Sequence, residues 1–126
     1  MEKGPAAREP DGKFRKRERV LKSKDFRVVY KKGLSVKLGP LVLCYVPNNM
    51  AHSRLGFSIS SRNTKRASDR NRARRLFREV YRRHKSEIKR PFDLVIVVKR
   101  NLSERMGYRE AEEALLKLIK NAGLLA

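Results

Sequence analysis

The pattern of hydrophobic and polar positions predicts a short helix from its cap, Ser23, to about Lys32. Its apolar residues Phe26, Val29 and Tyr30 recur at i, i+3 and i+4, the spacing of one face of an α-helix. The first residue of the segment is a serine, a residue type that caps helices, and the glycine that follows the segment is of a type that ends them.

Two strands are predicted after this helix. Leu41–Val46 is a continuous apolar run that a Pro-Asn-Asn turn sequence closes, as expected of a buried strand. In Leu55–Ser60, apolar residues alternate with glycine and serine, so one face of the strand is apolar and the other is small and polar.

The second half of the chain predicts two helices around a central strand. Ala67–Lys89 has apolar residues at helical spacing, and Pro91 ends the helix. Phe92–Lys99 is strongly apolar, which favours a central place in a sheet. A last amphipathic helix is expected over Tyr108–Asn121, with Gly123 as its stop.

This order predicts a single small α/β (α+β) domain. It is a two-layer sandwich in the order α-β-β(-β)-α-β-α, with an optional further strand and with the long basic helix in the crossover. A chain of 126 residues is long enough for one ordinary core. Residues 1–19 are charged and carry glycine and proline, so they predict a disordered basic tail, and residues 20–126 form the domain.

Charge indicates the class of partner. The chain has 33 Lys and Arg against 13 Asp and Glu, a formal net charge of +20. Self-repulsion of this size destabilises a compact state, which is best explained if a polyanion normally neutralises it. Nucleic acid and an anionic membrane surface are the candidates. The longest apolar runs, Leu41–Val46 and Leu94–Val98, are far shorter than the about 20 residues of a membrane span, so we expect nucleic acid and no membrane.

The number of cysteines indicates the cellular compartment. The single cysteine, Cys44, excludes an internal disulfide and fits the reducing cytoplasm, where we expect the protein. The N-terminus lacks the apolar segment of a secretory signal. The sequence has no Cys and His cluster with metal-ligand spacing, so we expect no metal ligands in the protein. Taken alone, Cys44 is most simply a small core residue.

Half of the net charge lies in Arg62–Arg90, which holds 13 Lys and Arg against 3 Asp and Glu, a net +10. At about 100° per residue, the apolar residues of the predicted helix share one arc and the arginines cluster on another side, together with Asn71. Ordinary solvated helices mix charge signs, whereas Arg74, Arg78 and Arg82 repeat one sign at i+4, which disfavours an isolated helix. Arginine also binds phosphate oxygens bidentately and stacks on bases, so the pattern favours an RNA-binding face.

Within this stretch, Arg70-Asn71-Arg72 resembles the signature of the bacterial ribonuclease P protein family. Arg74, Arg75, Arg78 and Glu79 continue the match. The likeness covers about residues 19 to 122, and it extends to the first helix and to the strands on either side of the signature, in the runs Lys24-Asp25-Phe26, Arg54-Leu55-Gly56-Phe57-Ser58-Ile59 and Phe92-Asp93-Leu94-Val95-Ile96.

The chain departs from the family pattern at two places. Relatives usually have a basic pair and a glycine before the signature, whereas Ser60–Lys65 has no glycine and one extra residue. Many relatives also have an aromatic residue where this chain has Cys44.

The resemblance implies a subunit of an endoribonuclease whose RNA subunit holds the metal-dependent active site, with Mg²⁺ held largely by RNA. The implied partners are the ribonuclease P RNA and precursor tRNA, whose 5′ leader lies in a cleft between the first helix and one sheet face. It also implies a left-handed crossover, against the usual rule. No catalytic residue and no bound cofactor are expected in the protein. The residues expected to bind the RNA subunit are Arg62, Arg66, Arg70, Asn71, Arg72, Arg74, Arg75, Arg78 and Arg82. Those expected to bind the leader are Phe26, Tyr30, Cys44, Ser58 and Ser60.

Several alternatives remain open at this stage. Phe26 and Tyr30 can equally be core residues between helix and sheet. A self-sufficient nuclease is a poor fit, because the carboxylates are scattered and His52 and His84 each stand alone. A ribosomal protein or RNA chaperone would share the charge and the fold class, and an arginine-rich helix can also enter a DNA major groove.

Overall fold

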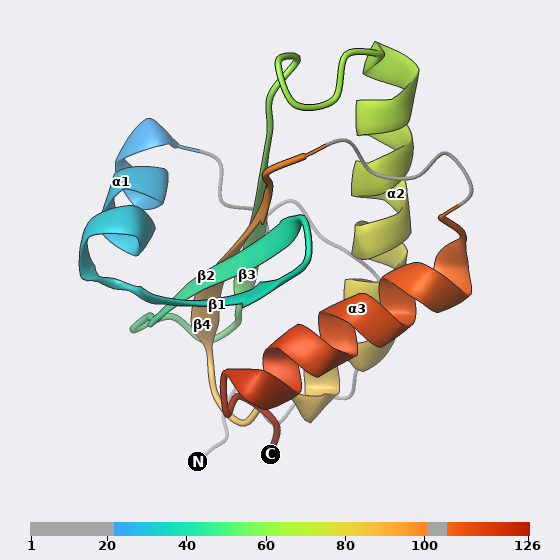
Figure 1. The fold of residues 1–126 in the computed structure, drawn as a ribbon. Coiled ribbons are helices and arrows are strands. Elements are labelled where there is room, and N and C mark those ends of the chain that lie inside the picture. Colours follow the sequence, from blue (N-terminus) through green and yellow to red (C-terminus); the bar gives the residue numbers. More distant parts are fainter. Residues whose placement is uncertain (1–21, 101–105) are drawn as a thin grey trace.

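The computed structural model describes residues 22–100 and 106–126 and shows one α+β domain (Figure 1). Along the chain the elements are α1 (Ser23–Lys32), β1 (Leu34–Leu38), β2 (Leu41–Pro47), β3 (Arg54–Ile59), α2 (Ala67–His84), a 3₁₀ turn η3 (Lys85–Glu87), β4 (Phe92–Val98) and α3 (Tyr108–Asn121). The predicted tail, residues 1–19, lies outside the described residues. No helix of the described part is long and apolar enough to cross a membrane.

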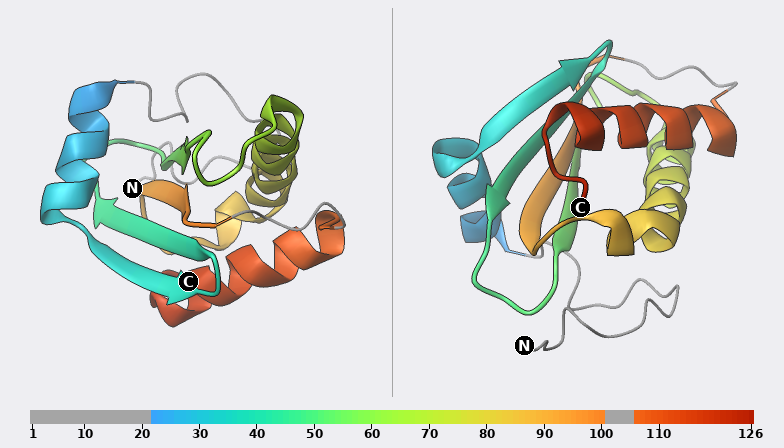
Figure 2. Two further views of the ribbon diagram at one scale, coloured as in Figure 1. Left: turned by 45° about the horizontal axis from the view of Figure 1, so that its top comes forward. Right: turned by 90° about the horizontal axis from the view of Figure 1, so that it is seen from below.

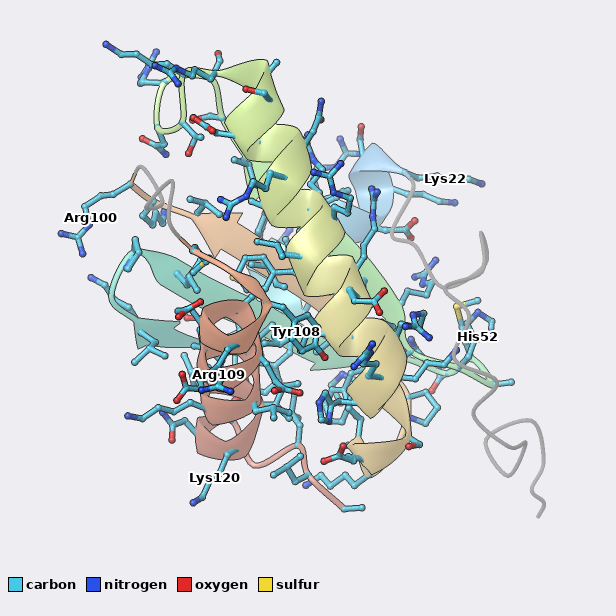
Figure 3. The ribbon with its side chains drawn as sticks, turned by 90° about the vertical axis from the view of Figure 1, so that its right-hand side faces the viewer. Lys22, His52, Arg100, Tyr108, Arg109 and Lys120 are labelled. Carbon is cyan, nitrogen blue, oxygen red and sulfur yellow. The ribbon has the colours of Figure 1, made fainter. Side chains whose placement is uncertain are left out.

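The four strands form one sheet in the order β1-β2-β4-β3. β2 pairs antiparallel with both β1 and β4, whereas β3 pairs parallel with β4. β4 is therefore central, and six of its seven residues are buried, as its apolar sequence predicted. Viewed from the side of α2, β4 lies to the left of β3 (Figure 3). The β3–α2–β4 crossover is thus left-handed, as the family resemblance implied and against the general preference.

Helices lie on both faces of this sheet (Figure 2). On one face α2 and α3 cover a single apolar cluster, to which the strands contribute Leu43, Leu55 and Ile96 among others. On the other face α1 packs on β2 and β4, and there Val29 and Val95 are buried outside the main cluster. The predicted α/β domain is confirmed, and α1 adds a partial third layer to the two expected.

Element ends differ from the sequence prediction where tertiary contacts decide them. Lys22, not Ser23, is the N-cap of α1, and its side chain makes no capping hydrogen bond. α2 ends at His84 rather than at Lys89, because Ile88 leaves the helix to form a β-bridge with Leu125. β1 is the optional strand that the sequence pattern did not place. It is short, its residues are exposed or half-buried, and the positive φ of Gly39 (57°) begins its turn into β2.

At two positions the structure requires a glycine. A Cβ at Gly33 would lie 2.4 Å from the Val29 carbonyl oxygen and 2.6 Å from that of Tyr45, so only glycine lets α1 end against β2. Gly123 has φ 75° and follows α3 in a Schellman motif, in which Leu124 N–H donates to Ile119 O (3.1 Å).

Candidate nucleic-acid interface

α2 packs one face on the sheet and exposes the arginines of the other. Ala73, Phe77, Val80 and Tyr81 are buried, and these belong to the apolar arc that the sequence predicted. The predicted RNA-binding residues on the other side differ in exposure. Arg62, Arg66, Asn71 and Arg75 are exposed, and Arg70, Arg72, Arg74, Arg78 and Arg82 are half-buried.

Two arginines of the signature are held by the protein itself. Arg70 Nη1 donates to the carbonyl oxygens of Thr64 (2.8 Å) and Lys65 (2.9 Å), so it fastens the loop before α2. Arg72 Nη2 donates to the carbonyl oxygen of Met106, just before α3. Both guanidinium groups therefore use some of their N–H donors within the protein, to fix the shape of the surface. The spacing of arginines in the sequence does not reveal these internal hydrogen bonds.

Three further arginines of α2, Arg74, Arg78 and Arg82, are held in place by neighbours. Arg74 Nη1 donates to Asn71 Oδ1 at 3.1 Å, and the Arg78 guanidinium lies 5.5 Å from the centre of the Phe57 ring. Arg82 forms a two-point ion pair with Glu79, whose pKa the hydrogen bond from Arg82 lowers. These contacts orient the guanidinium groups for an anion before one binds.

The turn before α2 closes without a glycine. Ser60 Oγ accepts a hydrogen bond from the Asn63 backbone N–H (3.1 Å), and the Asn63 side chain donates to Val98 O (3.2 Å). Thr64 N–H donates to Ser60 O at 2.9 Å. Ser60 therefore shapes the loop, in addition to the leader contact that the sequence predicted for it.

The opposite face of the sheet carries the predicted leader residues. Across β2, β4 and β3, Cys44 lies opposite Val95, and Val95 lies opposite Gly56. The next row is Val42, Val97 and Ser58, all half-buried. Cys44 and Ser58 thus lie in adjacent rows of one surface, and Ser60 follows the end of β3. Burial raises the pKa of the Cys44 thiol, so the thiol is neutral at physiological pH.

The aromatic pair on α1 borders this face. The Phe26 and Tyr30 ring centres are 6.3 Å apart. Phe26 is half-buried, whereas Tyr30 is 48% exposed. Tyr30 is therefore not the core residue that the alternative interpretation required, and Phe26 is only partly one.

An ion-pair network that the sequence analysis did not predict anchors α1 to the sheet. Arg54 donates to both carboxylate oxygens of Asp93, at 2.8 and 2.6 Å, and its Nη2 reaches Asp25 of α1 at 3.4 Å. Asp93 is 4% exposed, and it also accepts from the Asn48 side chain at 2.8 Å. The hydrogen bond to Asp93 is the largest cause that raises the pKa of Arg54. The one feature of the sequence that could have indicated this network is Asp93, an acidic residue within an otherwise apolar strand.

Two lysines next to this surface were also missed. Lys37 lies opposite Val42 in the strand register and is exposed. Lys99 follows β4, is exposed, and its backbone N–H donates to Pro40 O at 2.7 Å. Both therefore place an exposed cation next to the half-buried row of Val42, Val97 and Ser58.

Titratable groups also cluster between α2 and α3. His84 Nε2 lies 2.7 Å from Glu112 Oε2, and its Nδ1 contacts Glu87. Burial disfavours the charge on His84, but the hydrogen bonds to Glu112 and Glu87 outweigh it and raise its pKa. Within residues 22–100 and 106–126, no group of three His, Cys, Asp or Glu side chains is arranged to hold a metal ion.

Comparisons with known proteins find similar sequences and similar folds. The family model of Ribonuclease P matches residues 14–123. The ribonuclease P protein component of Alkaliphilus metalliredigens is 36% identical over 108 residues, which cover 86% of this chain and 96% of that protein. The solved structure of the Staphylococcus aureus RNase P protein matches with a TM-score of 0.76 at 31% identity, over 86% of this chain and 98% of that one. That of the Thermotoga maritima protein matches with a TM-score of 0.73 at 34% identity, over 82% and 96%. Sequence and fold agree over most of the chain, so this chain belongs to the ribonuclease P protein component family, the protein subunits of a ribonucleoprotein endoribonuclease.

Proposed function

We propose that this chain binds the RNA subunit of ribonuclease P and the 5′ leader of precursor tRNA, and thereby promotes endonucleolytic removal of the leader. The observation that carries this proposal is that the two faces of the sheet present different kinds of side chain. One side presents the arginines of α2, and the other combines an aromatic pair with a partly open strand surface.

The α2 side fits a folded RNA backbone. Its guanidinium groups are numerous, partly immobilised by Asn71, Glu79 and Phe57, and planar, so they can bind phosphates bidentately at a low entropic cost. In this proposal the RNA subunit lies along Arg62, Arg66, Asn71, Arg74, Arg75, Arg78 and Arg82, while Arg70 and Arg72 hold the surface in shape.

The α1 side fits a single strand. Bases stack on Tyr30 and on the exposed part of Phe26, at about 1–3 kcal/mol per base. The RNA backbone of the leader crosses the sheet surface at the row of Val42, Val97 and Ser58. There Ser58 offers a small hydroxyl, and Lys37 and Lys99 offer positive charge. Cys44 is half-buried on this face of the sheet, and its small side chain leaves more room than the aromatic residue of many relatives.

In this proposal the hydrolytic step takes place in the RNA, which holds the Mg²⁺ ions that activate the nucleophile. The protein contributes binding energy and orientation through the two surfaces. Precursor tRNA and the ribonuclease P RNA are the partners, and the cytoplasm is the compartment.

Reconstitution tests the proposal. The purified protein is mixed with the ribonuclease P RNA of the same organism, and cleavage of a leader-bearing tRNA is followed at low magnesium. We expect cleavage at the mature 5′ end that requires both components, and none by the protein alone. Cleavage by nuclease-free protein, or no stimulation of the RNA by the protein, would contradict the proposal.

A further inference from the structure

The outer face of α1 carries a second basic stripe. At about 100° per residue, Lys24, Arg27 and Lys31 lie within about 60° of one another, on the side of the helix opposite Val29, which packs on the sheet. All three side chains are exposed. The stripe therefore faces away from the strand surface, and Tyr30 lies on the flank of α1 between the two, about 60° from Arg27.

Helix stability accounts for Lys31, which lies in the last turn where the helix dipole favours a cation, but not for Lys24 or Arg27. Lys24 lies in the first turn and Lys22 is the N-cap, where the helix dipole disfavours positive charge. Arg27 and Lys31 form a like-charge pair at i+4. Asp25 is the single acidic residue of α1, and its carboxylate reaches Arg54 on the sheet. A polyanion on this face would offset these unfavourable terms.

The stripe is also separated from the arginines of α2 by the whole sheet. α1 lies on one face, and α2 with α3 lies on the other (Figure 2). Lys24 to Arg27 to Lys31 spans about 10 Å at 1.5 Å per residue, about three phosphates of a duplex strand. Figure 3 shows Lys22, at the start of α1, extending away from the ribbon.

We propose that the outer face of α1 is a second RNA-binding surface, which takes the phosphate backbone of an RNA duplex segment different from the one held by α2. The protein then joins two RNA segments across its sheet, with the single-stranded leader between them. Three side chains at this spacing recognise charge and not base identity, so the contact is independent of sequence.

The test uses a short, blunt RNA duplex, which cannot enter a single-strand cleft. Variant one replaces Lys24, Arg27 and Lys31 by Gln. A matched control replaces three exposed cations of α3, Arg109, Lys117 and Lys120, by Gln, which removes the same charge from another surface. Figure 3 shows Arg109 and Lys120 extending from α3. Gln has nearly the helix propensity of Lys and Arg, so both variants should fold, and thermal melting checks this.

Sedimentation measures how many duplexes bind, and a salt titration measures the slope of log K. We expect two duplexes per wild-type protein and per α3 variant, but one per α1 variant. On a longer structured RNA, the α1 variant should lower the slope by about 2–3, at about 0.7–0.9 per lost phosphate contact. Two bound duplexes with an unchanged slope in the α1 variant, or an equal loss in the α3 control, would overturn the proposal. Since no cleavage is measured, the result does not depend on the leader cleft.

Discussion

Arg70 and Arg75 lie on the same helix and in the same family signature, yet the structure gives them different tasks. The Arg70 guanidinium is half-buried and donates to the Thr64 and Lys65 carbonyl oxygens, whereas Arg75 is exposed. A phosphate contact is a feature of the complex, but a carbonyl contact exists already in the free protein. Mutation of the two residues should therefore have separable effects.

Arg70→Ala should lower the free energy of unfolding by about 1–3 kcal/mol, because it leaves the carbonyl oxygens of the loop without their charged donor. Arg75→Ala should leave unfolding unchanged but lower the salt slope of RNA binding by about 0.7–0.9. Denaturant titration and a salt series on both variants check this. Equal stability of the two variants would show that Arg70 does not hold the loop.

The ion pair of Arg54 with Asp93 also shapes the protein through internal contacts, as Arg70 does. Arg54→Ala should cost about 3–5 kcal/mol, since it leaves the Asp93 carboxylate buried without its partner. Asp25→Asn is the control, because it removes only the longer 3.4 Å contact and should cost much less. Thermal or denaturant unfolding measures both. A loss of less than about 1 kcal/mol in Arg54→Ala would contradict the anchoring role.

At the scale of elements, the sequence predicted best where periodicity alone decides. The ranges of α1 and α3 and the cores of β2, β3 and β4 follow from spacing, because the apolar residues of each element recur at helix or strand spacing within that element. The end of α2 does not, since Ile88 pairs with Leu125, 37 residues away. The Arg54–Asp93 pair likewise depends on strand register across 39 residues. Local patterns predicted which helix is basic but not which arginines the fold itself uses.

The contact between α2 and α3 should be sensitive to pH. His84, which Glu112 and Glu87 flank, has a folded pKa above its ordinary 6.5. The folded protein thus holds this proton more tightly, so the contribution is complete below about 6.5 and is lost as pH rises through the folded pKa. Arg83 and Tyr108 lie beside the cluster, and burial raises the pKa of Tyr108 above its ordinary 10.0, so Tyr108 stays neutral in this range.

A His84→Gln variant isolates this contribution. The difference in unfolding free energy between wild type and variant should shrink as the pH is raised from about 6 to about 9. Denaturant unfolding at several pH values measures the difference. A difference that grows with pH would mean that His84 is neutral in the folded protein.

At the scale of the whole molecule, the sheet separates two kinds of surface. α2 and α3 share the large apolar cluster, so that side is rigid and presents a fixed array of guanidinium groups. α1 rests on a smaller contact through Val29, the Arg54 network and the close approach at Gly33. The net charge of +20 is thus spread over surfaces that face different directions, as the proposed position between several RNA segments requires.

The most direct test of the account compares how the reconstituted holoenzyme binds leader-bearing and leaderless tRNA. Tyr30→Ala should reduce the preference for the leader-bearing form by about 1–3 kcal/mol, because one stacking ring is lost. Val28→Ala is the control, since this side chain is similarly exposed (43% against 48%) but lies on the other flank of α1. Affinity for the RNA subunit and protein stability should stay unchanged in both variants. If Tyr30→Ala binds both tRNA forms as the wild type does, the leader does not lie along α1, and the central claim is wrong.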